Sequence, residues 1–371
     1  MKRIFCVVIA ILLFPFDVQG IGTSAKAAIL INGATGETVY EYNADVRLPM
    51  ASTTKIMTAL LLCENGDLDR EITVTAEMVR VEGSSMGLLP GDKVKLYDLL
   101  YGMLLASGND AANVTAYVLG GTVDGFVKQM NDKAKELGLL NTHFETPSGL
   151  DGDSHYTTAR DLALLAKYAM ENEVFCEAAG TKTKTLEYGN PPYRRTVTNH
   201  NRLLKSYDGA VGVKTGFTKK SGRCLVSAAK RDGEYLIAVT LFDPNDWADH
   251  KALLDYGFEK QELAEIITKN NKYLIPVICG EKDAEIGIEP FTVSTMDSKE
   301  FTYKINLPEF LYAPIEKGEI VGNVEYYKGG IKVGEQKLTC REEIKVLPQK
   351  ASFLNRLAEG FKSIFISVWE S

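Results

Sequence analysis

The chain has 371 residues, which is more than one hydrophobic core usually serves and suggests two domains. Hydrophobic residues make up 45% and charged residues 25%, a globular composition that excludes a disordered chain, a collagen and a coiled coil. The formal net charge is −7, and the absence of any basic run argues against a nucleic-acid binder. Six cysteines are too few for a disulfide scaffold.

The first twenty residues have the pattern of an export signal. A short basic start is followed by an uncharged run over 4–16, which is shorter than the roughly 20 apolar residues that span a bilayer. Such a start, followed by small residues, is typical of a secretory signal peptide. We therefore expect residues 1–20 to be removed, with cleavage between 20 and 27, because 18–20 and 25–27 both offer small residues. A buried N-terminal helix is the alternative.

The mature chain would keep five cysteines, an odd number that leaves at least one thiol unpaired. They are Cys63, Cys176, Cys224, Cys279 and Cys340. No C-x-x-C pair is present, which argues against a zinc site or a thioredoxin-like redox site, because both usually carry this motif. We expect buried structural thiols and no metal or other cofactor.

Between the two ends, the character of the sequence changes near residue 260. Hairpins are expected over 27–41 and 222–242, the second with a type I′ turn at Asp232-Gly233. Helical patterns lie between them and after them, over 52–63, 96–107, 111–119, 123–137, 159–170 and 248–256. Residues 27–260 are therefore predicted to form an α+β domain, with strands from both sequence ends around helices from the middle.

Residues 262–348 have a different pattern, with short strand-like runs and no long helical period. The runs cover 272–279, 301–305, 320–327 and 342–346, separated by Gly, Pro, Asn and Asp. This pattern predicts a small all-β domain.

The last twenty residues, 352–371, have the pattern of an amphipathic helix. Their large apolar residues recur at helical steps along one stripe: Phe353, Leu354, Leu357, Phe361, Ile364, Phe365, Val368 and Trp369. Two basic and two acidic residues on the other side cancel, so attraction to anionic lipid adds little. Four large aromatic residues favour burial in a membrane interface, and packing on a domain or on a partner is the alternative.

Three short motifs stand in order within the α+β domain: S-x-x-K at 52–55, S-x-N at 107–109 and K-T-G at 214–216. Penicillin-recognising serine enzymes carry this set of three. A second S-x-x-K at 227–230 serves as a control for chance matches. It falls in an expected strand, where residues three apart point to opposite faces, so its serine and lysine could not meet.

The first motif offers a nucleophile and a base. In a helix, residues three apart are neighbours, so Lys55 can approach the hydroxyl of Ser52. The apolar run around Lys55 would lower its pKa by desolvation, and the neutral amine could take the Ser52 proton. The backbone N–H of Ser52, with another just past the K-T-G strand, would form an oxyanion hole.

The other two motifs would line a cleft between helices and strands. Ser107 can relay protons, and Asn109 can orient the lysine or contact a substrate amide. Lys214 offers a charge and Thr215 a hydroxyl to a substrate carboxylate, and Gly216 leaves room for substrate backbone alongside the strand.

These motifs, with the longer stretches 51–58, 142–163, 199–204 and 208–218, resemble the low-molecular-mass penicillin-binding proteins that are serine-type D-alanyl-D-alanine carboxypeptidases. The resemblance implies a serine β-lactamase/transpeptidase-like catalytic domain over 27–260. The β domain over 262–348 is similar to that of the branch related to penicillin-binding protein 5. The segment 352–371 is similar to the membrane anchor of that branch.

The resemblance also implies a mechanism in which Ser52 attacks the carbonyl between the two terminal D-alanines of a peptidoglycan stem peptide. D-Alanine would leave, water would release the acyl-enzyme, and penicillins would acylate Ser52 as substrate mimics. The other motif residues would serve as base (Lys55), proton relay or electrostatic partners (Ser107, Lys214), orienter (Asn109) and carboxylate contact (Thr215). The implied location is the outer face of the cytoplasmic membrane, or outside the cell.

One departure from the family concerns the substrate carboxylate. Some members place an Arg before the last helix of the catalytic domain, and the corresponding stretch, 243–250, contains none. Arg202 is the candidate replacement. His200, which stands where other members carry a different polar residue, is a second candidate contact.

Four other functions share part of the pattern. A class A β-lactamase would need a Glu with Asn four residues on between the second and third motifs, and no glutamate there meets this condition. A Ser–His–Asp hydrolase would need a histidine as its base, and His143, His155, His200 and His250 have no marked partner in the sequence. A non-catalytic cell-wall module would be expected to lose Ser52 or Lys55. A DD-endopeptidase uses the same residues, although such relatives often lack the β domain.

Overall fold

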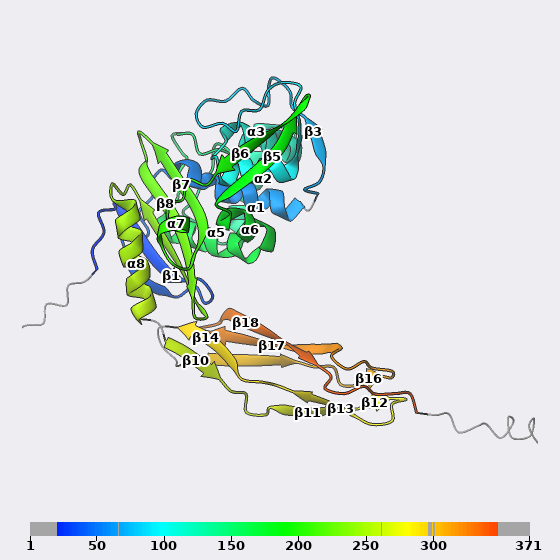
Figure 1. Cartoon of the computed structure of the whole chain (residues 1–371). Helices are drawn as coiled ribbons and strands as arrows, with labels where there is room; N and C mark the ends of the chain where they lie inside the picture. Colours follow the sequence, from blue (N-terminus) through cyan, green and yellow to red (C-terminus); the bar gives the residue numbers. More distant parts are fainter. Residues whose placement is uncertain (1–20, 66, 261, 296–298, 300, 348–371) are drawn as a thin grey trace, which may run out of the picture. The chain divides into compact units, whose positions relative to one another are not determined.

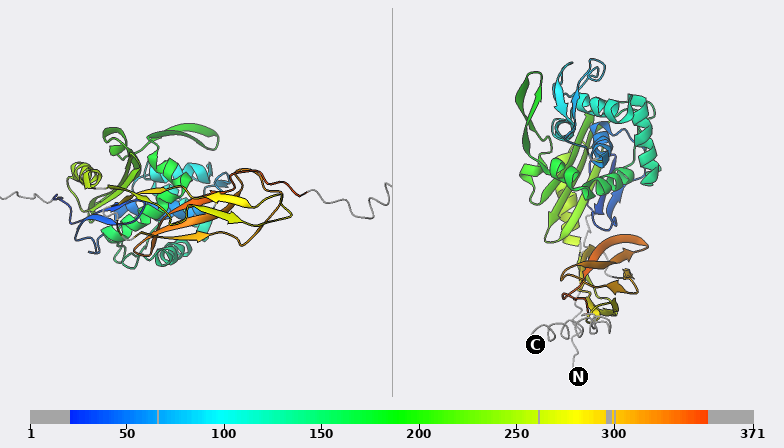
Figure 2. Two further views of the ribbon diagram at one scale, coloured as in Figure 1. Left: turned by 90° about the horizontal axis from the view of Figure 1, so that it is seen from below. Right: turned by 90° about the vertical axis from the view of Figure 1, so that its right-hand side faces the viewer.

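The computed structural model describes residues 21–347, apart from 66, 261, 296–298 and 300 (Figures 1 and 2). The expected signal peptide, 1–20, and the expected terminal helix, 352–371, lie outside the described residues. Within the part described, no helix is long and apolar enough to cross a membrane. The chain forms two compact units, an α+β unit made mostly of residues before 260 and a β unit made mostly of residues after it.

A five-stranded sheet forms the centre of the α+β unit. Its strand order is β2-β1-β9-β8-β7, so the first strand of the unit lies beside its last. The strands are β1 (Ala27–Asn32), β2 (Thr38–Tyr42), β7 (Ala210–Thr218), β8 (Gly222–Arg231) and β9 (Glu234–Leu241). Both expected hairpins are confirmed, and Asp232 and Gly233 have the positive φ values, 48° and 87°, that a type I′ turn requires.

Helices cover both faces of this sheet (Figure 1): α8 lies on one face, and α1, α2, α5 and α6 lie on the other. The helices are α1 (Lys55–Asn65), α2 (Leu96–Leu104), α3 (Asn109–Gly120), α4 (Val123–Glu136), α5 (Ala159–Glu171), α6 (Glu173–Gly180), α7 (Leu203–Ser206) and α8 (Asp246–Lys260). A 3₁₀ turn, η1 (Ala51–Thr54), precedes α1. The sequence patterns did not predict α6, α7 or two small antiparallel strand pairs, β3 (Glu71–Thr73) with β4 (Lys93–Lys95) and β5 (Thr183–Gly189) with β6 (Pro192–Thr198).

The helix expected over 96–107 is shorter than predicted, and the difference shapes the site. It ends at Leu104, and α3 begins at Asn109. Ser107 lies between them with φ 59°, outside the helical region. The S-x-N motif therefore forms the corner between two helices. This corner was not predicted from the sequence, because the apolar run over 99–105 continues almost up to it and hydrophobic periodicity cannot detect so short a turn.

The β unit contains only strands among its described residues, as predicted. They are β10 (Glu262–Ile266), β11 (Lys272–Ile275), β12 (Val277–Ile278), β13 (Ala284–Gly287), β14 (Phe291–Thr295), β15 (Phe301–Asn306), β16 (Leu311–Tyr312), β17 (Ile320–Lys328) and β18 (Ile331–Thr339). Strands β15, β17 and β18 form a three-stranded sheet, and the other strands form the two-stranded sheets β10-β14, β11-β13 and β12-β16. Their inward residues, including Ile286, Val324, Tyr326 and Leu338, form one hydrophobic core.

One predicted strand of the β unit is wrong, and five strands were not predicted: β10, β13, β14, β16 and β18. The run 342–346 is not a strand, because Ile344 and Val346 form single bridges with two different partners, Ile315 and Gly280. Strand β18 was missed because charged and polar residues alternate along it, and only Val333 and Leu338 turn fully inward.

The five described cysteines are unpaired. Cys63, Cys224 and Cys340 are buried, as expected for structural thiols. Cys176 is half-buried, and Cys279 is exposed, contrary to expectation.

The buried His250 of α8 makes the stability of the α+β unit sensitive to acid. Its Nδ1 lies 2.6 Å from Ser227 Oγ, and its Nε2 lies 3.0 Å from Thr240 Oγ1. Burial lowers the pKa of His250 to about 3. The unfolded chain therefore binds a proton below about pH 6.5 that the folded chain does not bind until about pH 3. Between these values, this group lowers the free energy of unfolding by about 1.4 kcal/mol for each unit by which the pH decreases.

We predict that His250→Gln removes this dependence between pH 6 and pH 4. The variant loses hydrogen bonds at every pH, so it should be less stable than the wild type at pH 8. Its free energy of unfolding, measured by denaturant titration, should then fall less steeply toward pH 4. Parallel curves for the two proteins would show that His250 is not the titrating group.

Candidate active site

The turn that carries Ser52 is held by close backbone contacts. Ala51, just before Ser52, has φ 48°, and a side-chain carbon at Gly149 would overlap the Ala51 carbonyl oxygen. A side-chain carbon at Gly216 of β7 would lie 3.0 Å from the Met50 carbonyl oxygen and 3.1 Å from the Ser52 nitrogen. A larger residue at 216 would push β7 and the turn apart by a few tenths of an ångström, so glycine suits this close approach. The structure thus gives Gly216 a packing role that the sequence did not suggest.

Lys55 lies one helical turn from Ser52 and is fully buried. Its Nζ is 3.0 Å from Ser52 Oγ, 2.7 Å from Asn109 Oδ1 and 2.7 Å from the Ser148 carbonyl oxygen. Burial, reinforced by repulsion from Lys214, holds the pKa of Lys55 well below its usual range, although Asp110 acts in the opposite direction. A lysine held in this state can accept a proton from the hydroxyl beside it.

A second buried lysine joins the S-x-N corner to the sheet. Lys214 Nζ donates to Ser107 Oγ at 3.0 Å and to the Thr215 carbonyl oxygen at 2.9 Å. Burial lowers the pKa of Lys214 to about 7. Because the Lys214 side chain is almost fully buried, it is better placed for proton relay through Ser107 than for direct contact with a substrate carboxylate.

The orientation of Asn109 is fixed by a loop that the sequence analysis did not single out. Its Nδ2 donates to the Glu82 carbonyl oxygen at 2.7 Å, and its backbone N–H donates to the Ser84 carbonyl oxygen at 2.7 Å. This arrangement leaves Asn109 Oδ1 as the acceptor for Lys55. The Asp110 carboxylate holds the same loop by accepting the backbone N–H groups of residues 86–88. The loop, in turn, places Ser84 at the cleft.

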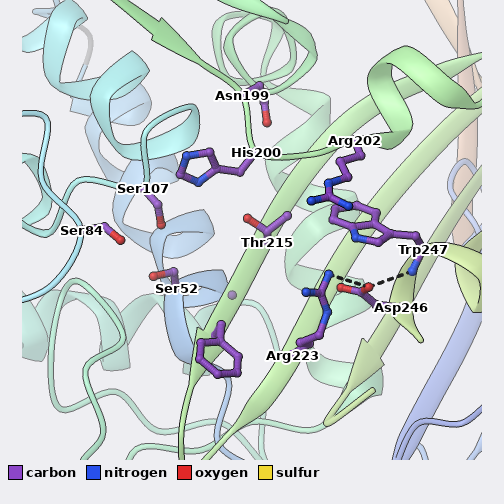
Figure 3. A pocket seen from close by; sticks show the side chains of 12 residues that line it. Ser52, Ser84, Ser107, Asn199, His200, Arg202, Thr215, Arg223, Asp246 and Trp247 are labelled. Atoms are coloured by element: carbon purple, nitrogen blue, oxygen red, sulfur yellow. Dashed lines mark hydrogen bonds and ion pairs between the residues drawn. The ribbon is translucent and has the colours of Figure 1, made fainter. Parts of the chain in front are cut away.

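The motifs meet at a cleft of about 500 Å³ (Figure 3). Six of the nine residues expected at the site line it: Ser52, Ser107, His200, Arg202, Thr215 and Gly216. The other three, Lys55, Asn109 and Lys214, are buried. Six further lining residues were not predicted as site residues: Ser84, Asn199, Phe217, Arg223, Asp246 and Trp247.

One end of the cleft carries two arginines beside Trp247. The guanidinium carbons of Arg202 and Arg223 lie 5.8 Å and 5.6 Å from the centre of the indole ring. Arg223 also donates to Asp246 Oδ1 at 2.8 Å. Arg223 lies on β8, opposite Phe217 of β7. Pairing of the expected hairpin over 222–242 with the K-T-G strand, had it been predicted from the sequence, would have placed Arg223 beside the site.

The histidines do not supply a base for Ser52. In the described part of the chain, the hydrogen bond of the Ser52 hydroxyl is with Lys55. His200 lines the cleft, and His155 lies behind the nucleophile turn. His155 Nδ1 accepts the Glu145 N–H at 2.9 Å, which leaves the Nε2 proton for Thr54 Oγ1. Burial lowers the pKa of His155 to about 4, so the ring stays neutral.

The second S-x-x-K motif has none of this geometry. Ser227 is buried and bonded to His250. Lys230 is exposed and lies over the Tyr235 ring, 4.6 Å from its centre. The prediction that this serine and lysine do not form a pair is confirmed.

Comparison with known proteins agrees with the geometry. The family model for D-alanyl-D-alanine carboxypeptidase (peptidase S11) matches residues 16–245, and that for the C-terminal domain of penicillin-binding protein 5 matches residues 262–346. The D-alanyl-D-alanine carboxypeptidase DacF of Bacillus subtilis is 33% identical over 348 residues, which cover 90% of this chain and 88% of DacF.

Two solved structures are also similar. Penicillin-binding protein 5 from Haemophilus influenzae has a TM-score of 0.64 at 26% identity, covering 88% of this chain and 99% of that one. The Streptomyces K15 DD-transpeptidase has a TM-score of 0.62 at 36% identity, covering 64% of this chain and 98% of that one. The chain therefore belongs to the D-alanyl-D-alanine carboxypeptidases of peptidase family S11, in the branch that carries a penicillin-binding protein 5 C-terminal domain.

Proposed function

We propose that the chain removes the terminal D-alanine from peptidoglycan stem peptides through an acyl-enzyme on Ser52, and that penicillins acylate the same hydroxyl. The main support is the contact of 3.0 Å between Ser52 Oγ and the amine of Lys55, whose pKa burial and Lys214 lower. A serine with a neutral amine in hydrogen-bond reach has the nucleophile and the base that acyl transfer requires.

In the acylation step, Lys55 takes the Ser52 proton while Oγ attacks the carbonyl between the two D-alanines. The backbone N–H of Ser52 and one from the K-T-G strand would stabilise the oxyanion. The leaving amine needs a proton, and the Lys214–Ser107 pair can deliver one to it. The proton on Lys55 then replaces the one that the Lys214–Ser107 pair gave up, so Lys55 is neutral again when water attacks the ester and can act as its base. The proton that Lys55 takes from this water passes to Ser52 Oγ as the shortened peptide leaves.

The arginine pair is proposed to bind the free carboxylate of the substrate together with Thr215. Arg223 has the stronger case, because Asp246 holds its guanidinium at the cleft. Arg202, the candidate from the sequence, lies at the same end but is exposed. His200 borders the cleft and is kept as a further substrate contact.

We further propose that the chain is exported and held at the outer face of the cytoplasmic membrane by segment 352–371. The sequence patterns of 1–20 and 352–371 support this location. The substrate also supports it, because peptidoglycan lies outside the cytoplasmic membrane.

The nucleophile is tested by labelling with a fluorescent penicillin. The wild type should label covalently, and Ser52→Ala should lose the label entirely, because Ser52 carries the hydroxyl that contacts Lys55 among the described residues. Ser227→Ala is the matched control from the second S-x-x-K motif and should label as the wild type does. An unlabelled wild type, or a labelled Ser52→Ala, would contradict the proposal.

The same preparations distinguish the alternative activities. The wild type should release D-alanine from a soluble pentapeptide faster than it cleaves a cross-linked muropeptide, and the reverse order would favour a DD-endopeptidase. Nitrocefin turnover should stay below about one per second, since the sequence lacks the E-x-x-x-N glutamate that deacylates class A β-lactamases.

The base is tested by the pH dependence of acylation. The second-order rate of wild-type acylation should rise with pH through the lowered pKa of Lys55, because only the neutral amine accepts the proton. Lys55→Arg stays protonated and should lower the rate by at least about 10³ across pH 5–10. Lys230→Arg is the control and should leave the profile unchanged. If Lys55→Arg keeps more than a tenth of the wild-type rate, another group is the base.

The carboxylate contact is tested with a peptide pair that ends in D-Ala-D-Ala as the free acid or the amide. Arg223→Gln should lower kcat/KM about 10- to 100-fold for the free acid and much less for the amide, because a charge-assisted hydrogen bond is lost only with the acid. Arg202→Gln, measured in parallel, should show a smaller change. Equal losses on both peptides would indicate a general effect on the cleft instead of carboxylate recognition.

A further inference from the structure

Exposed apolar side chains gather at one end of the β unit. They are Ile278, Phe310, Tyr312, Val346 and Leu347, each between 41% and 66% exposed and together called the end patch. The Phe310 and Tyr312 rings touch edge to face, with centroids 5.5 Å apart. Other exposed apolar residues of the unit, such as Leu263, Ile267 and Ile331, lie on other segments.

Backbone hydrogen bonds join the three segments that carry the end patch. Strands β12 and β16 pair in parallel, with Ile278 opposite Tyr312. The Leu347 N–H donates to the Cys279 carbonyl oxygen at 2.8 Å, and Val346 forms a bridge with Gly280. The patch is therefore one surface formed by neighbouring segments.

The strand register keeps these side chains outside. Val277 and Leu311, which precede Ile278 and Tyr312, turn toward the core, so their successors point away from it. Outward positions on a sheet with one solvated face are usually polar. Here apolar and aromatic residues occupy these positions, and within the described part of the chain their side chains remain exposed.

The end patch also lies where the described chain ends. Leu347 belongs to the patch, and the expected amphipathic segment begins at residue 352. Five residue steps span at most about 18 Å even when fully extended. Any membrane that holds 352–371 is therefore within about 18 Å of the patch.

We propose that the end patch is a second membrane contact, which inserts into the headgroup region of the lipid surface that holds segment 352–371. This inference rests on the proposed membrane location. A single marginal anchor binds membranes reversibly, and a second contact on the same molecule makes the attachment stable. Tyr312 suits this position, because the amphipathic ring of tyrosine favours the membrane interface, and the Phe310 ring beside it adds apolar area to bury there.

Two other occupants fit the patch less well. The apolar stripe of 352–371 would extend over roughly 30 Å as a helix, whereas the patch spans a few neighbouring strands at about 5 Å each. Folding back onto the patch would therefore leave most of the stripe uncovered. A second copy of the chain is also a poor fit, because five partly exposed side chains offer less area than the roughly 800 Å² per partner of a stable interface.

The test is co-sedimentation of the full chain with phosphatidylcholine vesicles. The patch variant carries Ile278→Ser, Phe310→Ser and Tyr312→Ser. The control variant carries Leu263→Ser, Ile267→Ser and Ile331→Ser, at similarly exposed positions of the same unit. The patch variant should partition onto vesicles at least tenfold more weakly than the wild type, and the control within about twofold. Both variants should release D-alanine from a soluble pentapeptide at the wild-type rate.

The outcomes separate the two proposals. A wild type that binds vesicles together with an equally tight patch variant overturns the second contact and leaves the anchor standing. A wild type that does not bind overturns both. A patch variant that changes the oligomeric state of the protein in the absence of vesicles assigns the patch to a second copy and also overturns the inference.

Cys279 provides a reporter next to the patch, because it is the exposed cysteine among the described residues. An environment-sensitive fluorophore on Cys279 should shift its emission to the blue only when vesicles are added. The shift should be lost in the patch variant and kept in the control variant. Emission that is already blue-shifted without vesicles would place segment 352–371 on the patch and overturn lipid contact.

Discussion

Two lysine side chains are buried beside one small cleft. Their burial makes the protonated, charged state of each lysine unfavourable, and the chemistry of the site depends on this constraint. Lys55 and Lys214 are both removed from water, which lowers the pKa of each, and repulsion from Lys214 lowers the pKa of Lys55 further. Their hydrogen-bond acceptors are neutral oxygens from Ser52, Asn109, Ser148, Ser107 and Thr215. Neutral acceptors hold an amine in place without fixing its proton, as a carboxylate partner would. The pair can therefore exchange protons with a reacting substrate.

This arrangement requires segments that are distant in the sequence to meet closely. The nucleophile turn packs against β7 at Gly216, and the corner between α2 and α3 brings Ser107 to Lys214. Because of the close contact at Gly216, β7 and the turn that carries Ser52 cannot shift far without displacing each other. Small shifts of either part would change the distance between nucleophile and substrate, on which the rate of acyl transfer depends steeply.

The sequence predicted the parts of the site that are governed by local periodicity. Helical spacing placed Lys55 beside Ser52, and strand alternation ruled out Ser227 with Lys230; the contacts agree with both. Tertiary packing supplied what the sequence could not show. The Ser148 carbonyl and the loop at 82–88 reach the site through backbone groups, which have no residue signature.

The fold shows the same division between local pattern and tertiary contact. Both hairpins of the central sheet and the long helices followed from hydrophobic patterning. The hairpin of β5 and β6, rich in Thr, Arg and Lys, carries little apolar alternation and was missed. Arg223 and Trp247 were not assigned to the cleft, because only the pairing of β7 with β8 and the start of α8 bring them together.

Backbone hydrogen bonds to Asp110 anchor the loop that places Ser84 at the cleft. Asp110 holds three consecutive backbone N–H groups there, and these groups are present whatever side chains the loop carries. The path of this loop therefore depends on one carboxylate in α3 and on glycine at 83 and 87, where φ is 92° and 85°. Related enzymes that keep this carboxylate and these glycines could exchange Ser84, the side chain of this loop at the cleft, without rebuilding the two buried lysines behind it.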